Sequence, residues 1–174
     1  MARQASMRVM RTEVWIGVDV GVTGAVAILP QGGSTLLYDT PTLRRRVNRK
    51  QRTVYDPAEM LYILQPFERV AARVEVCIEH LHANGQNGSL SNFSEGLGVG
   101  YWHMAVVACG FRLRWVSPPV WKRFYGLIGC DKEASRQEAI HRFNASASAL
   151  TKKRHHGRAE ALLLAHYARS METP

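Results

Sequence analysis

The run Val14-Trp15-Ile16-Gly17-Val18-Asp19-Val20 is apolar at every position except Asp19. A strand this apolar is covered on both faces, which is typical of α/β folds. Burying the lone carboxylate of Asp19 there would be costly, and a metal ion, a cationic partner or a raised pKa usually offsets such a cost. Metal binding is therefore one interpretation of Asp19.

Two further segments place acidic or imidazole side chains where they could join Asp19. The predicted strand Val74 to Glu79 ends in a carboxylate just before a glycine-containing loop, and α/β folds build sites at such strand ends. His156 and Glu160 are four residues apart at the start of an apolar helix, so they share one face and could share one ion. Together these residues predict one divalent-metal site, made by Asp19, Glu79, His156 and Glu160.

Each of the four has a plainer interpretation when taken singly. Asp19 would cap a turn, Glu79 would be a solvated strand end, His156 would be a loop histidine, and Glu160 would be an exposed residue favoured by the helix dipole. Their combination is what favours a site.

The charge of the chain indicates its partner. Its 174 residues contain 23 Lys and Arg against 14 Asp and Glu, a net charge of +9 and a pI near 9.9. Such a balance favours a polyanion, and nucleic acid fits best. No small-molecule substrate is expected. No apolar run approaches the roughly 20 residues that a membrane-spanning helix needs.

Residues 1–12 are expected to form a flexible arm without the apolar core of a secretory signal, and residues 13–171 a single domain. Three cysteines without CxxC spacing argue against a disulfide framework and favour a reducing compartment. We therefore expect the cytoplasm of a bacterium or phage-infected host, or an organelle matrix in a eukaryote.

Local patterns predict the order of elements. Three antiparallel strands are expected at 14–20, 24–30 and 34–40, then a basic loop or flexible hairpin at 42–53. A helix capped by Asp56 should run to about Arg73. The strand at 74–79, a long helix at 91–109, a strand at 111–116 and helices at 118–126, 131–143 and 157–171 follow. This is the order of a ribonuclease H-like fold, an α/β fold with a mixed five-stranded sheet flanked by helices.

Four stretches in this order, at 16–24, 78–80, 118–132 and 156–162, resemble RuvC-type Holliday junction resolvases. The likeness is greatest to the plant chloroplast branch and related phage forms, and it extends from Val14 to about Tyr167. It implies a homodimeric endonuclease that uses two Mg²⁺ ions, or Mn²⁺, to cut two opposed strands of a four-way junction. The catalytic, metal-binding tetrad carries over as Asp19, Glu79, His156 and Glu160, and the junction-contacting lysines as Lys122 and Lys132.

Position 155 departs from the chloroplast pattern of Asp-His-Gly-Arg-Ala followed by an acid, because His155 stands in place of the aspartate. The change would alter metal preference or impair activity if that aspartate binds or orients a ligand. Bacterial RuvC stacks an aromatic at the crossover, and His82 and Phe93 are the nearby candidates. Further phosphate contacts are expected from the other basic residues of the surface, Arg44, Arg45, Arg46, Arg49, Lys50, Arg52, Lys152, Lys153 and Arg158.

The chemistry expected of these groups is two-metal phosphodiester hydrolysis. Asp19 is the expected bridging ligand, with Glu79 on one ion and Glu160 on the other. His156 is left open as a ligand or as the base toward the attacking water, and Lys132 would stabilise charge on the phosphate. Symmetric nicking needs two sites related by a two-fold axis, and the long helix at 91–109 is the expected dimer interface.

Other classes compete with the resolvase. A catalytically impaired protein of the same fold would bind branched DNA without cutting it, and another ribonuclease H-like nuclease would prefer RNA:DNA hybrids. The stretch Asp19 to Gly24 also resembles the first phosphate motif of sugar kinases and actin-like ATPases. That class is excluded by size, because it needs two such domains and a second glycine-rich motif.

Overall fold

The computed structural model describes residues 12–47, 49–80, 85 and 88–171. The elements in chain order are β1 (Thr12–Asp19), β2 (Ala25–Pro30), β3 (Leu36–Asp39), β4 (Thr42–Val47), β5 (Lys50–Tyr55), α1 (Pro57–Leu64), α2 (Pro66–Val70), β6 (Ala71–Glu79), α3 (Ser89–Ala108), β7 (Arg112–Val116), α4 (Pro118–Phe124), α5 (Lys132–Arg142), the 3-10 helices η1 (Asn144–Leu150) and η2 (Lys153–His155), and α6 (His156–Ser170).

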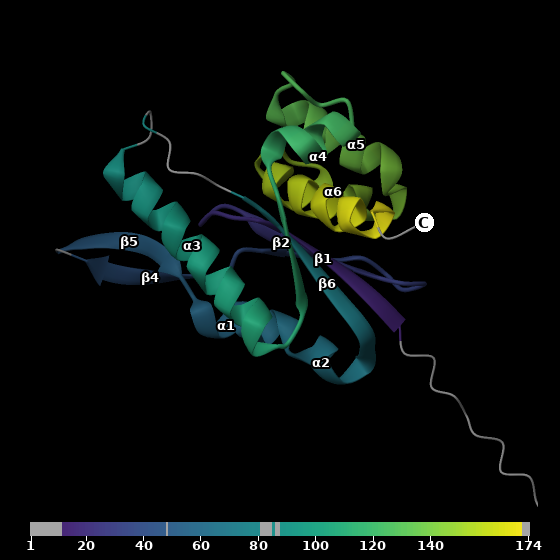
Figure 1. Cartoon of the computed structure of the whole chain (residues 1–174). Helices are drawn as coiled ribbons and strands as arrows, with labels where there is room; N and C mark the ends of the chain where they lie inside the picture. The colour runs from purple at the N-terminus through teal and green to yellow at the C-terminus, as the bar shows by residue number, and fades with distance from the viewer. Residues whose placement is uncertain (1–11, 48, 81–84, 86–87, 172–174) are drawn as a thin grey trace, which may run out of the picture.

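A mixed sheet with the strand order β3-β2-β1-β6-β7 forms the centre of the molecule. β1, β2 and β3 form an antiparallel meander, and β1, β6 and β7 run parallel to one another. Helices α4, α5 and α6 lie on one side of the sheet, and α1 and α3 lie on the other (Figure 1). The predicted mixed five-stranded sheet flanked by helices is confirmed.

The alternation of side chains along the strands creates two apolar cores. Trp15 and Cys77 face the side covered by α6, whereas Ile16 and Ile78 face the side covered by α1 and α3. Because successive strand residues point to opposite faces, the apolar character of β1 and β6 reflects burial on both sides, as the sequence pattern predicts.

Helix α6 packs directly on β1 at Gly17. A Cβ atom on Gly17 would lie 2.0 Å from the carbonyl oxygen of Ala161 and 2.4 Å from the backbone nitrogen of Ala165. Only glycine permits so close an approach of two backbones. The packing brings the N-terminal turn of α6 to the carboxyl end of β1, where Asp19 lies.

The basic segment at 42–53 is a hairpin rather than a loop. β4 and β5 pair antiparallel as a separate two-stranded sheet, from Thr42 opposite Tyr55 to Val47 opposite Lys50. The hairpin alternative is therefore correct, and the strands extend past the predicted end to Tyr55. It lies beside α3, away from the central sheet (Figure 1).

The predicted helix from Asp56 to Arg73 is two helices instead of one, and its last three residues belong to β6. Asp56 does cap the helix, accepting a hydrogen bond from the Glu59 N–H at 3.2 Å, but α1 ends at Leu64. Pro66 begins the short helix α2, because proline cannot donate within a continuing helix but suits the first turn. Arg73 already pairs with Glu13 in the sheet.

Thr12 belongs to β1, so the arm predicted at 1–12 is one residue too long, and its remainder lies outside the described residues. Over the described part of the chain, no helix combines the length and apolarity needed to cross a membrane.

Candidate active site

Three carboxylates meet at the carboxyl ends of β1 and β6. The parallel register pairs Val18 with Ile78, so the next residues, Asp19 and Glu79, end neighbouring strands at the same edge. Their alternation directs both side chains to the face that α6 covers. Glu160, in α6, is buried with 7% exposure and completes an acidic cluster of Asp19, Glu79 and Glu160.

Electrostatic repulsion couples the three acids. Burial raises the pKa of Asp19 well above its ordinary value, and the negative charges of Glu160 and Glu79 raise it further, while Lys132 and Lys122 lower it. Burial also raises the pKa of Glu79, against a hydrogen bond from Trp121. Negative charges that oppose the ionisation of Asp19 and Glu79 in this way form a site that a divalent cation would stabilise.

Helix α6 approaches Asp19 through a glycine. A Cβ atom on Gly157 would lie 2.9 Å from Asp19 Oδ2 and 3.1 Å from the carbonyl oxygen of Thr23. The Oε1 atom of Glu160 is buried and has no hydrogen-bond partner among the described residues. A buried acceptor left in this state is costly, and a bound cation would remove that cost.

The donor chemistry of the cluster fits a hard divalent cation. Carboxylate oxygens are the ligands that Mg²⁺ prefers, and Glu160 Oε1 is available. Within the described ranges, however, no three His, Cys, Asp or Glu side chains are already grouped to hold a metal ion. The acidic cluster thus supplies suitable donors without forming a finished coordination shell.

His156 lies at the same cleft as Asp19. Its Nδ1 atom is 3.2 Å from the carbonyl oxygen of Lys153. A carbonyl oxygen can only accept, so Nδ1 carries the proton in this contact, and in the neutral imidazole Nε2 would be the nitrogen with a free lone pair. That lone pair suits either of the two roles that the sequence left open, a metal ligand or a base.

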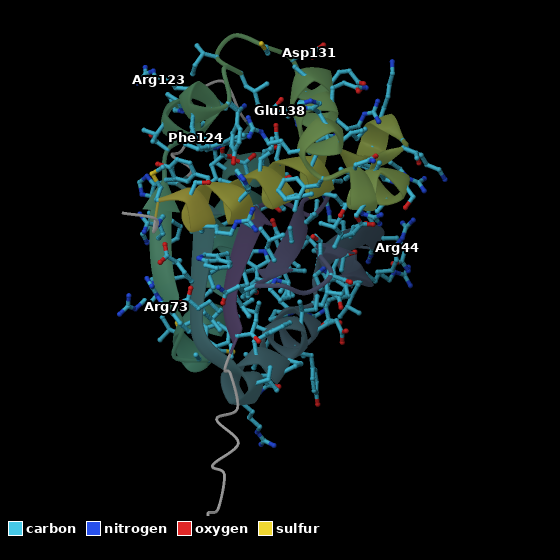
Figure 2. The ribbon with its side chains drawn as sticks, turned by 90° about the vertical axis from the view of Figure 1, so that its right-hand side faces the viewer. Arg44, Arg73, Arg123, Phe124, Asp131 and Glu138 are labelled. Atoms are coloured by element: carbon cyan, nitrogen blue, oxygen red, sulfur yellow. The ribbon has the colours of Figure 1, made fainter. Side chains whose placement is uncertain are left out.

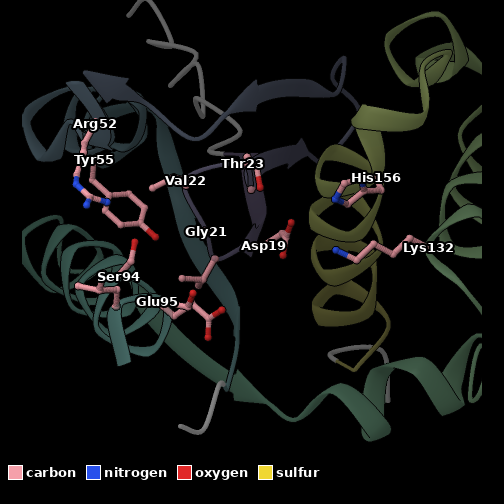
Figure 3. Close-up of a pocket in the computed structure, with 14 residues that line it drawn as sticks. Asp19, Gly21, Val22, Thr23, Arg52, Tyr55, Ser94, Glu95, Lys132 and His156 are labelled. Atoms are coloured by element: carbon pink, nitrogen blue, oxygen red, sulfur yellow. The ribbon is translucent and has the colours of Figure 1, made fainter. Parts of the chain in front are cut away.

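A cleft of about 420 Å³ opens beside Asp19. Lys132 and His156 project toward Asp19 from one side, and Arg52, Tyr55, Ser94 and Glu95 line the other (Figure 3). The cleft therefore extends from Asp19 to the base of the β4–β5 hairpin and the first turns of α3.

Sequence reasoning missed several residues of this site. The Nε1–H group of Trp121 donates a hydrogen bond to Glu79 Oε1 at 2.8 Å, from a residue that the sequence marks only as apolar. Tyr55, Ser94 and Glu95 line the cleft, and no local pattern singles them out. The glycine between His156 and Arg158 was the one available signal, because it allows the close approach to Asp19.

Most of the predicted DNA-contacting cations lie on exposed surface. The six basic residues of the hairpin are exposed, and Arg44 points outward at the periphery (Figure 2). Arg52 lines the cleft, and the Lys122 Nζ atom lies 5.3 Å from the Trp121 ring centroid. Lys152 and Lys153 are exposed before α6.

The remaining predicted residues have other surroundings. Arg158 binds the carboxylate of Asp39 through two hydrogen bonds, of 2.6 and 2.8 Å, so its guanidinium ties α6 to β3. Phe93 is 66% exposed on α3, and His82 lies outside the described residues.

His155 is buried, with 8% exposure, and caps the turn before α6. Its Nδ1 atom accepts a hydrogen bond from the Lys152 backbone N–H at 3.2 Å. Burial and the nearby charges of Arg158 and Arg154 lower its pKa, which favours the neutral imidazole that this bond requires.

Comparison of the chain with protein-family models and with curated protein sequences finds no match. Among solved structures, it is similar to Thermus thermophilus RuvC, with 18% identity, a TM-score of 0.53, and coverage of 91% of this chain and 96% of that chain. The structure of T. thermophilus RuvC in complex with a Holliday junction substrate matches with 17% identity, a TM-score of 0.54 and the same coverage.

This chain has the fold of RuvC. The predicted ribonuclease H-like fold and the predicted likeness to RuvC are confirmed. The nearer likeness to the chloroplast branch and to phage forms stays a prediction. In this RuvC fold, the acidic cluster occupies the carboxyl ends of the two central parallel strands.

Proposed function

We propose that this chain is a metal-dependent endonuclease that resolves four-way DNA junctions by paired symmetric nicks. The observation that carries the proposal is the acidic cluster, in which burial and then the negative charges of Glu160 and Glu79 raise the pKa of Asp19. The likeness to a RuvC structure that contains a Holliday junction substrate indicates the class of DNA.

The residues present would divide the work as follows. Asp19, Glu79 and Glu160 would hold the metal ions through their carboxylate oxygens. Bound Mg²⁺ or Mn²⁺ ions would neutralise phosphate charge and activate water. His156 would bind a metal or accept the proton of the attacking water through Nε2. Lys132, on the cleft wall, would stabilise charge that develops on the phosphate.

The β4–β5 hairpin is the proposed second contact with DNA. It carries Arg44, Arg45, Arg46, Arg49, Lys50 and Arg52 and no acidic residue. Arg45 stands directly opposite Arg52, and like charges in such a pair destabilise a hairpin. A phosphate bound between them would remove that repulsion, so the hairpin is better suited to a DNA complex than to free solution.

The exposed face of α3 is the proposed dimer interface. Leu90, Phe93, Leu97, Met104 and Val107 are exposed large apolar residues and recur with the alternating three- and four-residue spacing of a helix-pairing seam, interrupted only at Gly100. An exposed apolar stripe of this kind marks an interaction surface. A second copy of the chain suits it because a symmetric junction calls for two equivalent sites.

The glycines of α3 support this interface. Gly98 is explained by packing within the chain, since a Cβ atom there would lie 2.4 Å from the Tyr55 hydroxyl. A Cβ atom on Gly96 or Gly100 would meet nothing within 4 Å. Glycine in an exposed helix costs about 1 kcal/mol relative to alanine, and close approach of a partner backbone would account for keeping it at these two positions.

A second candidate function is binding of branched DNA without cleavage, which the histidine at position 155 favours. His155 caps the turn before α6 through Lys152 and does not contribute a carboxylate, as the aspartate of the chloroplast pattern would. A His155→Asp variant that cuts junctions when the unaltered chain only binds them would establish this alternative.

A substrate panel tests the proposed function. The chain should cut an immobile four-way junction, but not a matched linear duplex or an RNA:DNA hybrid, when Mg²⁺ or Mn²⁺ is present. Asp19→Asn should bind the junction and leave it intact. Preference for the hybrid would replace the proposal with a ribonuclease, and equal cleavage of junction and duplex would reject junction selectivity.

A further inference from the structure

Trp121 contacts the acidic cluster from within the core. It is fully buried in α4, and its ring packs against Tyr125 with the ring centroids 6.4 Å apart. Its Nε1–H group donates to Glu79 Oε1 at 2.8 Å. Because the core fixes the indole ring, the direction of this N–H group is fixed as well.

A second tryptophan shows that this contact is not a general consequence of burial. Trp102 is equally buried, at 0% exposure, and its Nε1 atom has no hydrogen-bond partner among the described residues. The fold therefore tolerates a buried indole N–H without an acceptor. The pairing of Trp121 with a carboxylate at the site needs its own explanation.

Glu79 has a specific need for such a donor. It ends β6, and its side chain has three rotatable bonds, so an unassisted carboxylate would sample several positions. Burial and Glu160 oppose its ionisation, whereas the Trp121 hydrogen bond and the Lys122 charge favour it. Lys122 also lies over the Trp121 ring, so adjacent residues of α4 act on the same carboxylate.

We propose that Trp121 is a positioning residue whose indole N–H holds Glu79 Oε1 and leaves the second oxygen of Glu79 to bind a divalent cation. This inference rests on the proposed metal-dependent nuclease. Residues that hydrogen-bond a metal ligand fix its orientation, and their loss typically weakens metal binding. Trp121 itself would contact neither metal nor DNA.

The first test uses the metal-free protein and needs no activity. The Trp121 indole N–H proton should exchange slowly with solvent. Its resonance in ¹H–¹⁵N spectra should shift in the Glu79→Ala variant. The Trp102 indole resonance is the internal control and should not respond. A Trp121 resonance that ignores Glu79→Ala would overturn the proposed contact.

The second test measures Mn²⁺ binding by calorimetry for Trp121→Phe and Trp102→Phe. Trp121→Phe keeps an aromatic ring and should weaken Mn²⁺ binding about 10- to 100-fold, the range usual for loss of such a partner. Trp102→Phe should bind as the unaltered chain does, and both variants should bind a junction normally without metal. Equal weakening in the two variants would indicate a packing defect and overturn the positioning role.

The two tests separate this inference from the proposed function. If the unaltered chain binds no Mn²⁺, the proposed nuclease is rejected together with the metal-binding role of Glu79. If it binds Mn²⁺ and Trp121→Phe binds equally well, the nuclease stands and the positioning role is rejected.

Discussion

At the scale of single residues, the acidic cluster lowers the stability of the folded chain at neutral pH. The folded chain buries Asp19 and Glu79 and places negative charge beside them, and both effects raise their pKa values. Each of the two groups therefore holds its proton more tightly in the folded than in the unfolded state. The contribution of these two groups to the free energy of unfolding is then greatest below the ordinary carboxyl pKa and is lost as the pH rises toward the raised values. Raised pKa values that lower stability in this way are typical of functional sites.

Asp19→Asn should therefore stabilise the metal-free protein at neutral pH while abolishing cleavage. Removing the repelling carboxylate should raise the free energy of unfolding by about 0.5 to 2 kcal/mol, and the gain should vanish below about pH 4, where aspartate is ordinarily protonated. Thermal unfolding in the presence of a chelator, measured at both pH values, checks this.

Asp39→Asn is the matched control for that measurement, and its effect on the free energy of unfolding should have the opposite sign. The hydrogen bond from Arg158 lowers the pKa of Asp39, so this variant should lose stability at neutral pH and change little in acid. A destabilised Asp19→Asn at neutral pH would contradict the proposed repulsion.

Asp19 and Glu79 could be predicted from the sequence, whereas Trp121 could not. Asp19 was recognisable because a carboxylate interrupts an apolar strand, and Glu79 because it ends one. Trp121 carried no such signal, since its partner lies 42 positions away in the chain, and only the tertiary fold brings the two together.

At the scale of elements, Gly157 allows the N-terminal turn of α6 to approach the Asp19 carboxylate closely. Gly157→Ala would place a methyl group 2.9 Å from Asp19 Oδ2, so α6 should shift, with a cost of about 1 to 3 kcal/mol and a loss of Mn²⁺ binding. Gly96→Ala, where a Cβ meets nothing of the same chain within 4 Å, is the control for Mn²⁺ binding and should leave that binding unchanged. Unchanged metal binding in Gly157→Ala would contradict the role of this approach.

The β4–β5 hairpin should contribute to DNA affinity rather than to stability. Arg45→Gln should weaken junction binding uniformly across sequences and reduce the salt-dependence slope by about 1, while relieving its repulsion with Arg52. Binding measured at several salt concentrations checks this. Arg69→Gln on α2, also an exposed arginine, should change neither affinity nor slope, and an equal effect at both positions would contradict a specific hairpin contact.

Which elements the sequence could predict depended on whether local signals agreed with tertiary contacts. The meander was predictable from alternating apolar residues and glycine turns. The end of α1 was not, because residues 71–73 were assigned to a helix although they pair with β1 in the sheet. The 3-10 helices at Asn144–Leu150 and Lys153–His155 were not anticipated, since their Ala, Ser and Lys residues carry no distinctive pattern.

At the scale of the whole molecule, two sites must act on one junction. Met104→Glu, in the middle of the proposed α3 seam, should yield a monomer because charges would be buried at the interface. Light scattering at micromolar concentration checks this. Val70→Glu on α2 is the matched control, since both residues are 62% exposed, and a monomeric unaltered chain would contradict the interface.

Mapping of nicks on a four-way junction, with each strand labelled in turn, tests whether the acidic cluster makes this chain a junction resolvase. With Mg²⁺ or Mn²⁺, the chain should place two nicks at symmetry-related positions in opposed strands, and Asp19→Asn should place none. Unpaired nicks at scattered positions, or equal cutting of a linear duplex of the same sequence, would contradict a junction resolvase built on this acidic cluster.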